Sequence, residues 1–119
     1  MIIDIPDLPS TEICCHRAER LWVTVWIEIT ERQLTISGQD LGDVPKEWFG
    51  SDEFEYWYKF DEANTLKLLS TLSDGNTDPI AEFENRFSGL KGCEKLKEFC
   101  HAEGITYQYF SWVSHFDRD

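Results

Sequence analysis

Hydrophobic and polar positions alternate with period two in three segments of the first half of the chain. In residues 21–30 aliphatic side chains take every second position: Leu21, Val23, Val25, Ile27 and Ile29. The alternation recurs in residues 33–37 and, with aromatic side chains, in residues 53–60. Such a period in β-branched and aromatic residues is typical of strands. The short break Glu31-Arg32 predicts that the first two strands form a hairpin. Residues 38–50, with three glycines, Pro45 and several acids, are predicted to form a loop.

After residue 60 the apolar spacing changes to that of helices. Asp61 is suited to cap a helix that ends before residues 73–77, and Asp78-Pro79 supplies a capping acid and an initial proline for a second. A third helix is predicted from about Leu90 to Glu103, with Gly104 at its C-terminal end. The side chains predicted to face inward are Ala63, Leu66, Leu69, Leu72, Ile80, Phe83, Phe87, Cys93, Leu96 and Cys100. Residues 105–113 alternate again and predict a last strand.

The predicted order β-β-β-α-α-α-β favours a single α+β domain spanning residues 1–119. Strands grouped before helices suggest an antiparallel sheet of about four strands with the helices packed on one face. The last strand is expected to return to that sheet. Residues 1–12 are spaced by prolines and acids, and we expect an irregular or edge segment there. A chain of 119 residues is long enough to bury a core of its own.

The two faces of this sheet are expected to differ. The aliphatic side of residues 21–29, with Leu34 and Ile36, is predicted to meet the helices. The opposite face would carry Trp22, Trp26, Glu28, Glu55, Trp57 and Lys59, joined either by Tyr107 and Tyr109 or by Phe110 and Trp112. Tryptophans on a solvated face indicate a partner-binding surface. The alternative is that residues 1–20 cover the rings with Ile2, Ile3, Ile5, Leu8 and Ile13.

Charge narrows the class of partner. The chain has 23 acids and 11 bases, a net charge of −12. This charge repels nucleic acids and anionic membranes and favours a basic protein. Residues 38–62 hold eight acids and two lysines, which is half of the net charge, interleaved with aromatic side chains. The predicted partner-binding residues are Asp40, Asp43, Trp48, Asp52, Glu53, Glu55 and Trp57. The alternative is a solvated acidic loop that its aromatic residues anchor to the core.

The sequence offers little support for catalysis. Its glycines fit no phosphate-binding loop, and nothing links His16, His101 or His115 to a nucleophile. We predict no catalytic residue, metal or cofactor, and we favour a non-enzymatic protein over an enzyme. The four cysteines are interpreted as reduced thiols that fill the core.

Two segments or pairs of segments superficially resemble metal sites. A zinc site would use Cys14-Cys15-His16 and Cys100-His101, but these lack a CxxC pair, and adjacent residues point to opposite faces. Residues 74–78 resemble the start of a calcium loop. Pro79 stands where that loop needs glycine and Asn85 where it needs glutamate, so a turn and a helix cap are favoured.

Two further features of the sequence bear on where in the cell the protein is expected. No apolar run approaches the roughly 18 residues of a membrane helix. The first residues have no basic region and reach an acid and a proline early, unlike a secretory signal. We expect a cytoplasmic protein.

Three segments together resemble a class of known proteins. They are Leu34–Gly42, Phe49–Tyr58 and Tyr107–Trp112. With these the chain resembles small acidic bacterial proteins that are either uncharacterised or counted among the immunity proteins of toxin systems. The resemblance implies a cytoplasmic protein that binds and blocks a toxin, often a basic nuclease, through complementary acidic and aromatic groups. It carries over no individual functional residue.

The leading hypothesis is therefore a protein-binding module, most concretely an immunity-type inhibitor of a basic partner. A second hypothesis is a small-molecule-binding protein or enzyme with a pocket between sheet and helices. A third is a structural protein that associates with itself through its sheet.

Overall fold

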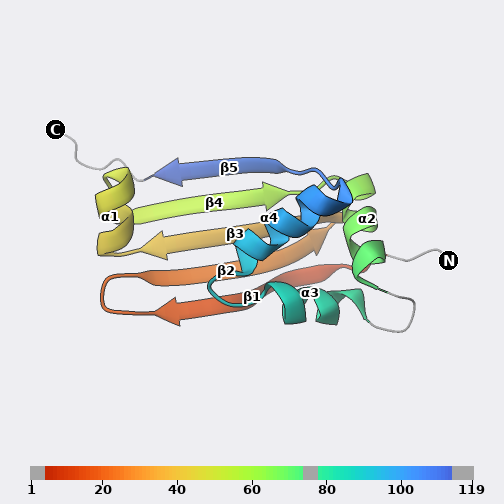
Figure 1. Cartoon of the computed structure of the whole chain (residues 1–119), viewed down its shortest axis with the longest axis horizontal. Coiled ribbons are helices and arrows are strands. Elements are labelled where there is room, and N and C mark those ends of the chain that lie inside the picture. Colours follow the sequence, from red (N-terminus) through yellow and green to blue (C-terminus); the bar gives the residue numbers. More distant parts are fainter. Residues whose placement is uncertain (1–4, 74–77, 114–119) are drawn as a thin grey trace.

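The computed structural model describes residues 5–73, 78–113 and no others. In chain order its elements are β1 (Leu8–Arg17), β2 (Trp22–Thr30), β3 (Gln33–Leu41), α1 (Asp43–Phe49), β4 (Glu53–Lys59), α2 (Glu62–Leu72), α3 (Pro79–Phe87), α4 (Gly92–Glu103) and β5 (Gln108–Val113). The strands form one antiparallel sheet in the order β1-β2-β3-β4-β5. Helices α2, α3 and α4 lie over one face, and α1 lies at one end of the sheet (Figure 1). The predicted α+β class is confirmed, with five strands rather than about four.

The β2-β3 hairpin forms where the sequence predicts it. Glu31 and Arg32 connect the strands with φ angles of 53° and 63°. Two successive positive φ angles are the backbone of the tight turn whose twist matches that of paired strands. The aliphatic set of β2 is buried, from Val23 at 5% exposure to Ile27 at 0%. The helices therefore cover the predicted face.

Of the two expectations for residues 1–12, an irregular or an edge segment, the structure confirms the edge from Leu8 onward, while residues 1–4 lie outside the described part of the chain. Residues 8–17 form β1, which pairs with β2. The pairing register shifts between Leu8 and Thr11 and again between Glu12 and Cys14. Each shift moves later side chains to the other face, which removes the period-two signal. Because β1 lies beside β2, it does not cover the tryptophan-bearing face, and the covering alternative is wrong for residues 8–17.

The prediction of a loop at residues 38–50 is also wrong. β3 continues to Leu41, and residues 43–49 form α1. The helix starts after Gly42, which has a φ of 118°, and ends at Gly50, which has a φ of 80°. Gly50 N–H closes the last turn on Lys46 O at 3.0 Å. The glycines predicted to make a loop therefore delimit a short helix, as left-handed residues often do.

The predicted caps of the longer helices are confirmed. Asp61 Oδ1 accepts a hydrogen bond from Asn64 N–H at 2.8 Å, and Asp78 Oδ1 accepts one from Ile80 N–H at 3.0 Å. Gly104 ends α4 with a φ of 70°. The turn expected at residues 74–77 lies outside the described residues. Of the predicted inward positions, Ala63 is exposed, and Thr65 and Leu68 are buried in α2 instead.

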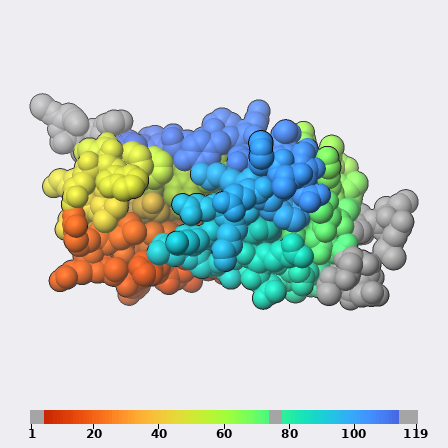
Figure 2. All heavy atoms as spheres, in the orientation of Figure 1, coloured from red at the N-terminus to blue at the C-terminus, as the bar shows by residue number. Residues whose placement is uncertain are grey.

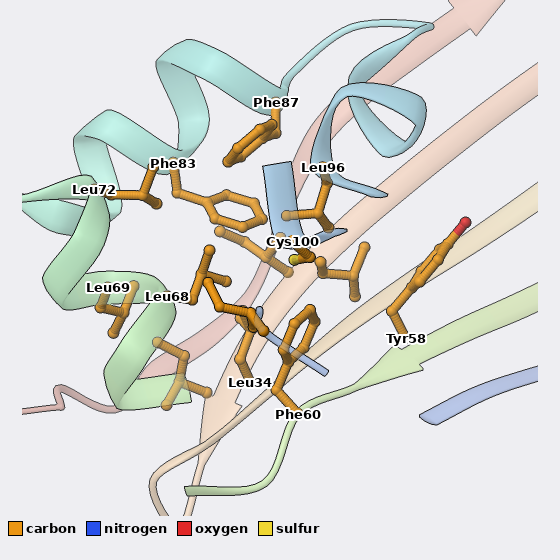
Figure 3. Packing of buried hydrophobic residues seen from close by; sticks show 14 of the residues in the cluster. Leu34, Tyr58, Phe60, Leu68, Leu69, Leu72, Phe83, Phe87, Leu96 and Cys100 are labelled. Carbon is orange, nitrogen blue, oxygen red and sulfur yellow. The ribbon is translucent and has the colours of Figure 1, made fainter. Parts of the chain in front are cut away.

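The core lies between the sheet and α2, α3 and α4 (Figure 3). Seen from the helix side, the atoms of α3 and α4 lie over the sheet (Figure 2). Phe60, Leu68 and Phe83 are at most 1% exposed. Such side chains each contribute roughly 1.5–3 kcal/mol by leaving water. In the described part of the chain, no helix combines the length and the apolar composition that crossing a membrane requires.

Candidate protein-binding surface

The sheet face turned away from α2, α3 and α4, here called the open face, carries large aromatic side chains. The strand register places five of them together: Trp22, Trp26, Trp57, Phe110 and Trp112. Trp26 is level with Ser37, Ser37 with Trp57, and Trp57 with Phe110. Three of the five rings are far from buried, with 39% exposure for Trp22, 47% for Phe110 and 48% for Trp112. The sequence left two choices for β5, and the structure places Phe110 and Trp112 on this face.

Cations contact this aromatic surface at two places. The Arg17 guanidinium carbon lies 4.1 Å from the centroid of the Trp22 ring, and Lys59 Nζ lies 5.7 Å from that of Phe110. Trp57, Lys59 and Phe110 also line a shallow hollow of about 280 Å³. Aromatic faces attract cations, and the protein's own Arg17 and Lys59 side chains take up these two positions.

Acidic residues border the open face on the side of α1. Trp112 is level with Glu55, and Glu53 follows on the same face of β4. Gln39 Nε2 donates a hydrogen bond to Glu53 Oε2 at 2.9 Å. Partial burial raises the pKa of the Glu55 carboxyl, and the neighbouring Glu53 raises it further. The charge on Glu55 is therefore less stable than that of an isolated glutamate, and a nearby cation would favour it.

Helix α1 extends this acidic border. Trp48 is 75% exposed, the highest value among the large hydrophobic side chains described. Phe49 fixes the helix to the sheet by stacking on Phe54, with ring centroids 4.1 Å apart and an interplanar angle of 13°. Arg20 forms ion pairs with Asp43, at 3.9 Å, and with Glu47. The other three acids at this end of the sheet are Asp52, Glu53 and Glu55. Among the described residues, no lysine or arginine forms an ion pair with any of them. We call Asp43, Glu47, Asp52, Glu53, Glu55 and Trp48 the acidic end.

The structure brings together most, but not all, of the predicted binding residues. Glu53, Glu55 and Trp57 share the open face, while Asp43, Trp48 and Asp52 lie at the same end of the sheet. The exception is Asp40, which lies on the helix-covered face of β3.

Asp40 is half-buried there, and it accepts a hydrogen bond from the Tyr56 hydroxyl at 3.5 Å. Burial raises the pKa of Asp40, and this hydrogen bond opposes the shift. Asp40 therefore does not belong to the candidate surface. Sequence reasoning also omitted Glu47, Phe110 and Trp112 from the binding set, although the alternation of residues 105–113 offered the last two as one of two choices.

The cysteines and histidines do not converge on a reactive centre. Cys14 and Cys100 are buried, as predicted, but Cys15 is exposed on the open face. Burial raises the pKa of Cys93 and of Cys100 to about 11, which keeps both thiols protonated at neutral pH. Among the described residues, no three His, Cys, Asp or Glu side chains are grouped to bind a metal. His115 lies outside the described residues.

A polar pocket of about 370 Å³ lies at the end of the sheet opposite α1. Its lining residues are Gln33, Lys59, Phe60, Asp61, Asn64, Thr106, Tyr107 and Gln108. Asn64 Oδ1 already accepts a hydrogen bond from Thr106 N–H at 2.9 Å. No cysteine or histidine lines this pocket, although convergent groups of that kind are what the small-molecule hypothesis would need there.

Comparison with known proteins leaves the candidate surface as the main guide to function. The open face and the acidic end are defined by the strand register, side-chain exposure and charge of this chain. The resemblance to immunity proteins stays a prediction. The chain matches no family model, no curated protein and no solved structure.

Proposed function

We propose that this protein is a non-enzymatic binding module for a basic protein, which docks on the open face and the acidic end. One observation carries the proposal: exposed aromatic rings on the open face adjoin acids to which no described cation is paired. The net charge of −12 supports the sign of the partner.

The aromatic side chains would stabilise the complex by burying apolar surface, and the acidic side chains would attract and orient the basic partner. Tryptophan is enriched among the residues that dominate interface energetics, because it buries a large rigid surface. An antiparallel sheet normally places polar side chains on a solvated face, and this one places Trp22, Trp57 and Trp112 there. A Lys or Arg from the partner beside Glu55 would relieve the unfavourable placement of that carboxylate.

The inhibitory form of the proposal is that this docking blocks the partner's own activity. An acidic module that covers a basic site competes with an anionic substrate for the same positive charges. Binding and inhibition are separate measurements, so the first can hold without the second.

The experiment captures the partner from the native host and measures its affinity with purified components. The acidic-end variant combines Asp52→Asn, Glu53→Gln and Glu55→Gln. Exposed ion pairs contribute roughly 0.2–1 kcal/mol each, so losing three weakens binding by about threefold to about 150-fold. Trp112→Ala should weaken binding by a further tenfold or so if the ring is a central contact. Affinity for the wild type should fall as salt rises.

A matched control variant distinguishes the effect of where negative charge is removed from the effect of how much is removed. Glu94→Gln, Glu98→Gln and Glu103→Gln remove three exposed acids from α4, on the other side of the sheet. Both triple variants have the same net charge, so this control should bind nearly as well as the wild type. Equal weakening in the two variants would show that overall charge alone drives the interaction. Unchanged affinity in the acidic-end variant would refute docking there.

A further inference from the structure

The two edges of the sheet are built differently. A strand at an edge presents unpaired backbone N–H and C=O groups, onto which another strand can add. Proteins protect such edges with prolines, charged side chains and irregular pairing. The edges here are β1 and β5, and only one of them carries these devices.

β1 has all three kinds of protection. Pro9 lies near its start and lacks a backbone donor. Glu12 and Arg17 place charges along the strand. Its pairing with β2 is interrupted by two register shifts, which bend and twist the outer edge. A second chain would therefore pair poorly with β1.

β5 has none of them. Its sequence, Gln108 to Val113, contains no charge and no proline, and its pairing with β4 runs without a shift. Five of its six residues are exposed. Tyr109 at 49%, Phe110 at 47% and Trp112 at 48% are among the most exposed large hydrophobic side chains described. An uncharged, regular and hydrophobic edge is the kind that pairs with another strand.

We propose that β5 pairs antiparallel with β5 of a second copy of this chain, joining two sheets into one. A twofold axis at Phe110 places this residue opposite its own copy, and Trp112 opposite the copy's Gln108. On the next strand inward, Lys59 is level with Gln108 and Glu55 is level with Trp112. Antiparallel pairing therefore brings the Lys59 end of one chain to the Glu55 end of the other. Parallel pairing would instead bring the Glu55 ends of the two chains to the same end of the joined sheet and gather negative charge there.

The net charge makes this dimer weak and dependent on salt. Each copy carries −12, so the two chains repel one another in dilute buffer. Interfaces below roughly 1,200 Å² are typical of weak or transient complexes, and the pairing of two six-residue strands is a small interface of this kind. We therefore expect association in the micromolar range or weaker. Salt screens the repulsion between copies. Self-association should therefore strengthen with salt, whereas docking of a basic partner should weaken.

Sedimentation equilibrium tests the proposal with the protein alone, from about 10 μM to about 500 μM and from about 50 mM to about 500 mM NaCl. Phe110→Lys places two ammonium groups at the twofold axis and should raise the dimer dissociation constant at least about tenfold. Ser10→Lys adds the same charge to β1 and should leave the dissociation constant near the wild-type value. Circular dichroism verifies that both variants fold.

Hydrogen exchange of the wild type tests the edge without any substitution. Backbone amides of β5 should become more protected as protein concentration rises, while those of β1 should not change. A strict monomer over the whole range of concentration and salt would overturn the proposal. A dimer that Phe110→Lys leaves intact, or that Ser10→Lys disrupts, would place the interface elsewhere and overturn it equally.

Discussion

Thr65 is the residue whose substitution tests the packing of the fold most directly. Its side chain is fully buried in α2, where it meets the ends of β3 and β4. Thr65 Oγ1 accepts a hydrogen bond from Leu34 N–H at 3.0 Å and donates one to Phe60 O at 3.3 Å. The hydroxyl of this one helical residue thus pairs with a backbone N–H of β3 and with the backbone C=O of the residue that follows β4. Thr65→Val keeps the shape of the side chain and removes both bonds.

The magnitude follows from what each group loses. A buried N–H without an acceptor costs about 1–3 kcal/mol, and Leu34 would be left in that state. The longer bond to Phe60 O adds about 0.5 kcal/mol. The extra methyl of valine offsets part of this, since one buried methyl is worth about 0.8 kcal/mol. We expect a net loss of about 0.7–2.7 kcal/mol in the free energy of unfolding, with a central value of about 1.7 kcal/mol. Thr65→Ser keeps the hydroxyl and loses only a methyl, so it should cost about 1 kcal/mol.

Urea unfolding followed by tryptophan fluorescence measures both variants. With a slope of about 2 kcal/mol per molar urea, Thr65→Val should lower the midpoint by about 1 M, and Thr65→Ser by about half as much. The Leu34 amide should also exchange faster in Thr65→Val than in Thr65→Ser. If Thr65→Val is no less stable than Thr65→Ser, the two hydrogen bonds do not stabilise the fold as the structure indicates.

Two further predictions concern single groups. Hydrogen bonds from the backbone and side chain of Asn64 lower the pKa of Asp61 from its ordinary 3.8. The stability that ionised Asp61 contributes is therefore fully present above about pH 4, and it is lost as the pH falls through the lowered pKa. Asp61→Asn keeps the cap without the titration and should lose less stability on acidification, and parallel pH profiles of the urea midpoint would contradict this. Cys15 is exposed while Cys14 and Cys100 are buried, so a thiol reagent near neutral pH should modify Cys15 first. Cys15→Ser should abolish that fast phase, and its persistence would show that another thiol is accessible.

The sequence predicted elements best where one local rule governed a whole segment. The alternation of residues 21–30 had no shift in register, and β2 formed with the predicted face inward. Asp61 and Asp78 capped their helices because a capping hydrogen bond involves only the next few residues. β1 was expected only as an irregular or edge segment, because its register shifts break the alternation that reveals a full strand. α1 was missed because a seven-residue helix without a side-chain cap has neither a long apolar period nor a start signal.

The candidate surface, too, was predicted from the sequence only in part. Its acids and tryptophans were predicted from their proximity in the sequence, and Glu53, Glu55 and Trp57 do share a face. Asp40 was included for the same reason, yet its place in β3 turns it toward the helices, where it meets Tyr56. Proximity along a strand cannot separate two faces that alternate at every residue. Phe110 and Trp112 are far from β4 in sequence, and they joined the surface only through pairing of β5 with β4.

By itself, the sequence determined the strand and helix periods, the caps, the net charge and the aromatic content of this protein. These properties depend on single residues or on neighbours within a few positions. Only the tertiary structure decided that β1 and β5 are the edges, that β5 is the unprotected one, and that Trp112 lies beside Glu55. Those facts depend on pairing between segments distant in the chain. The burial of every strand and helix together determines that pairing, because no single segment can bury its apolar side alone.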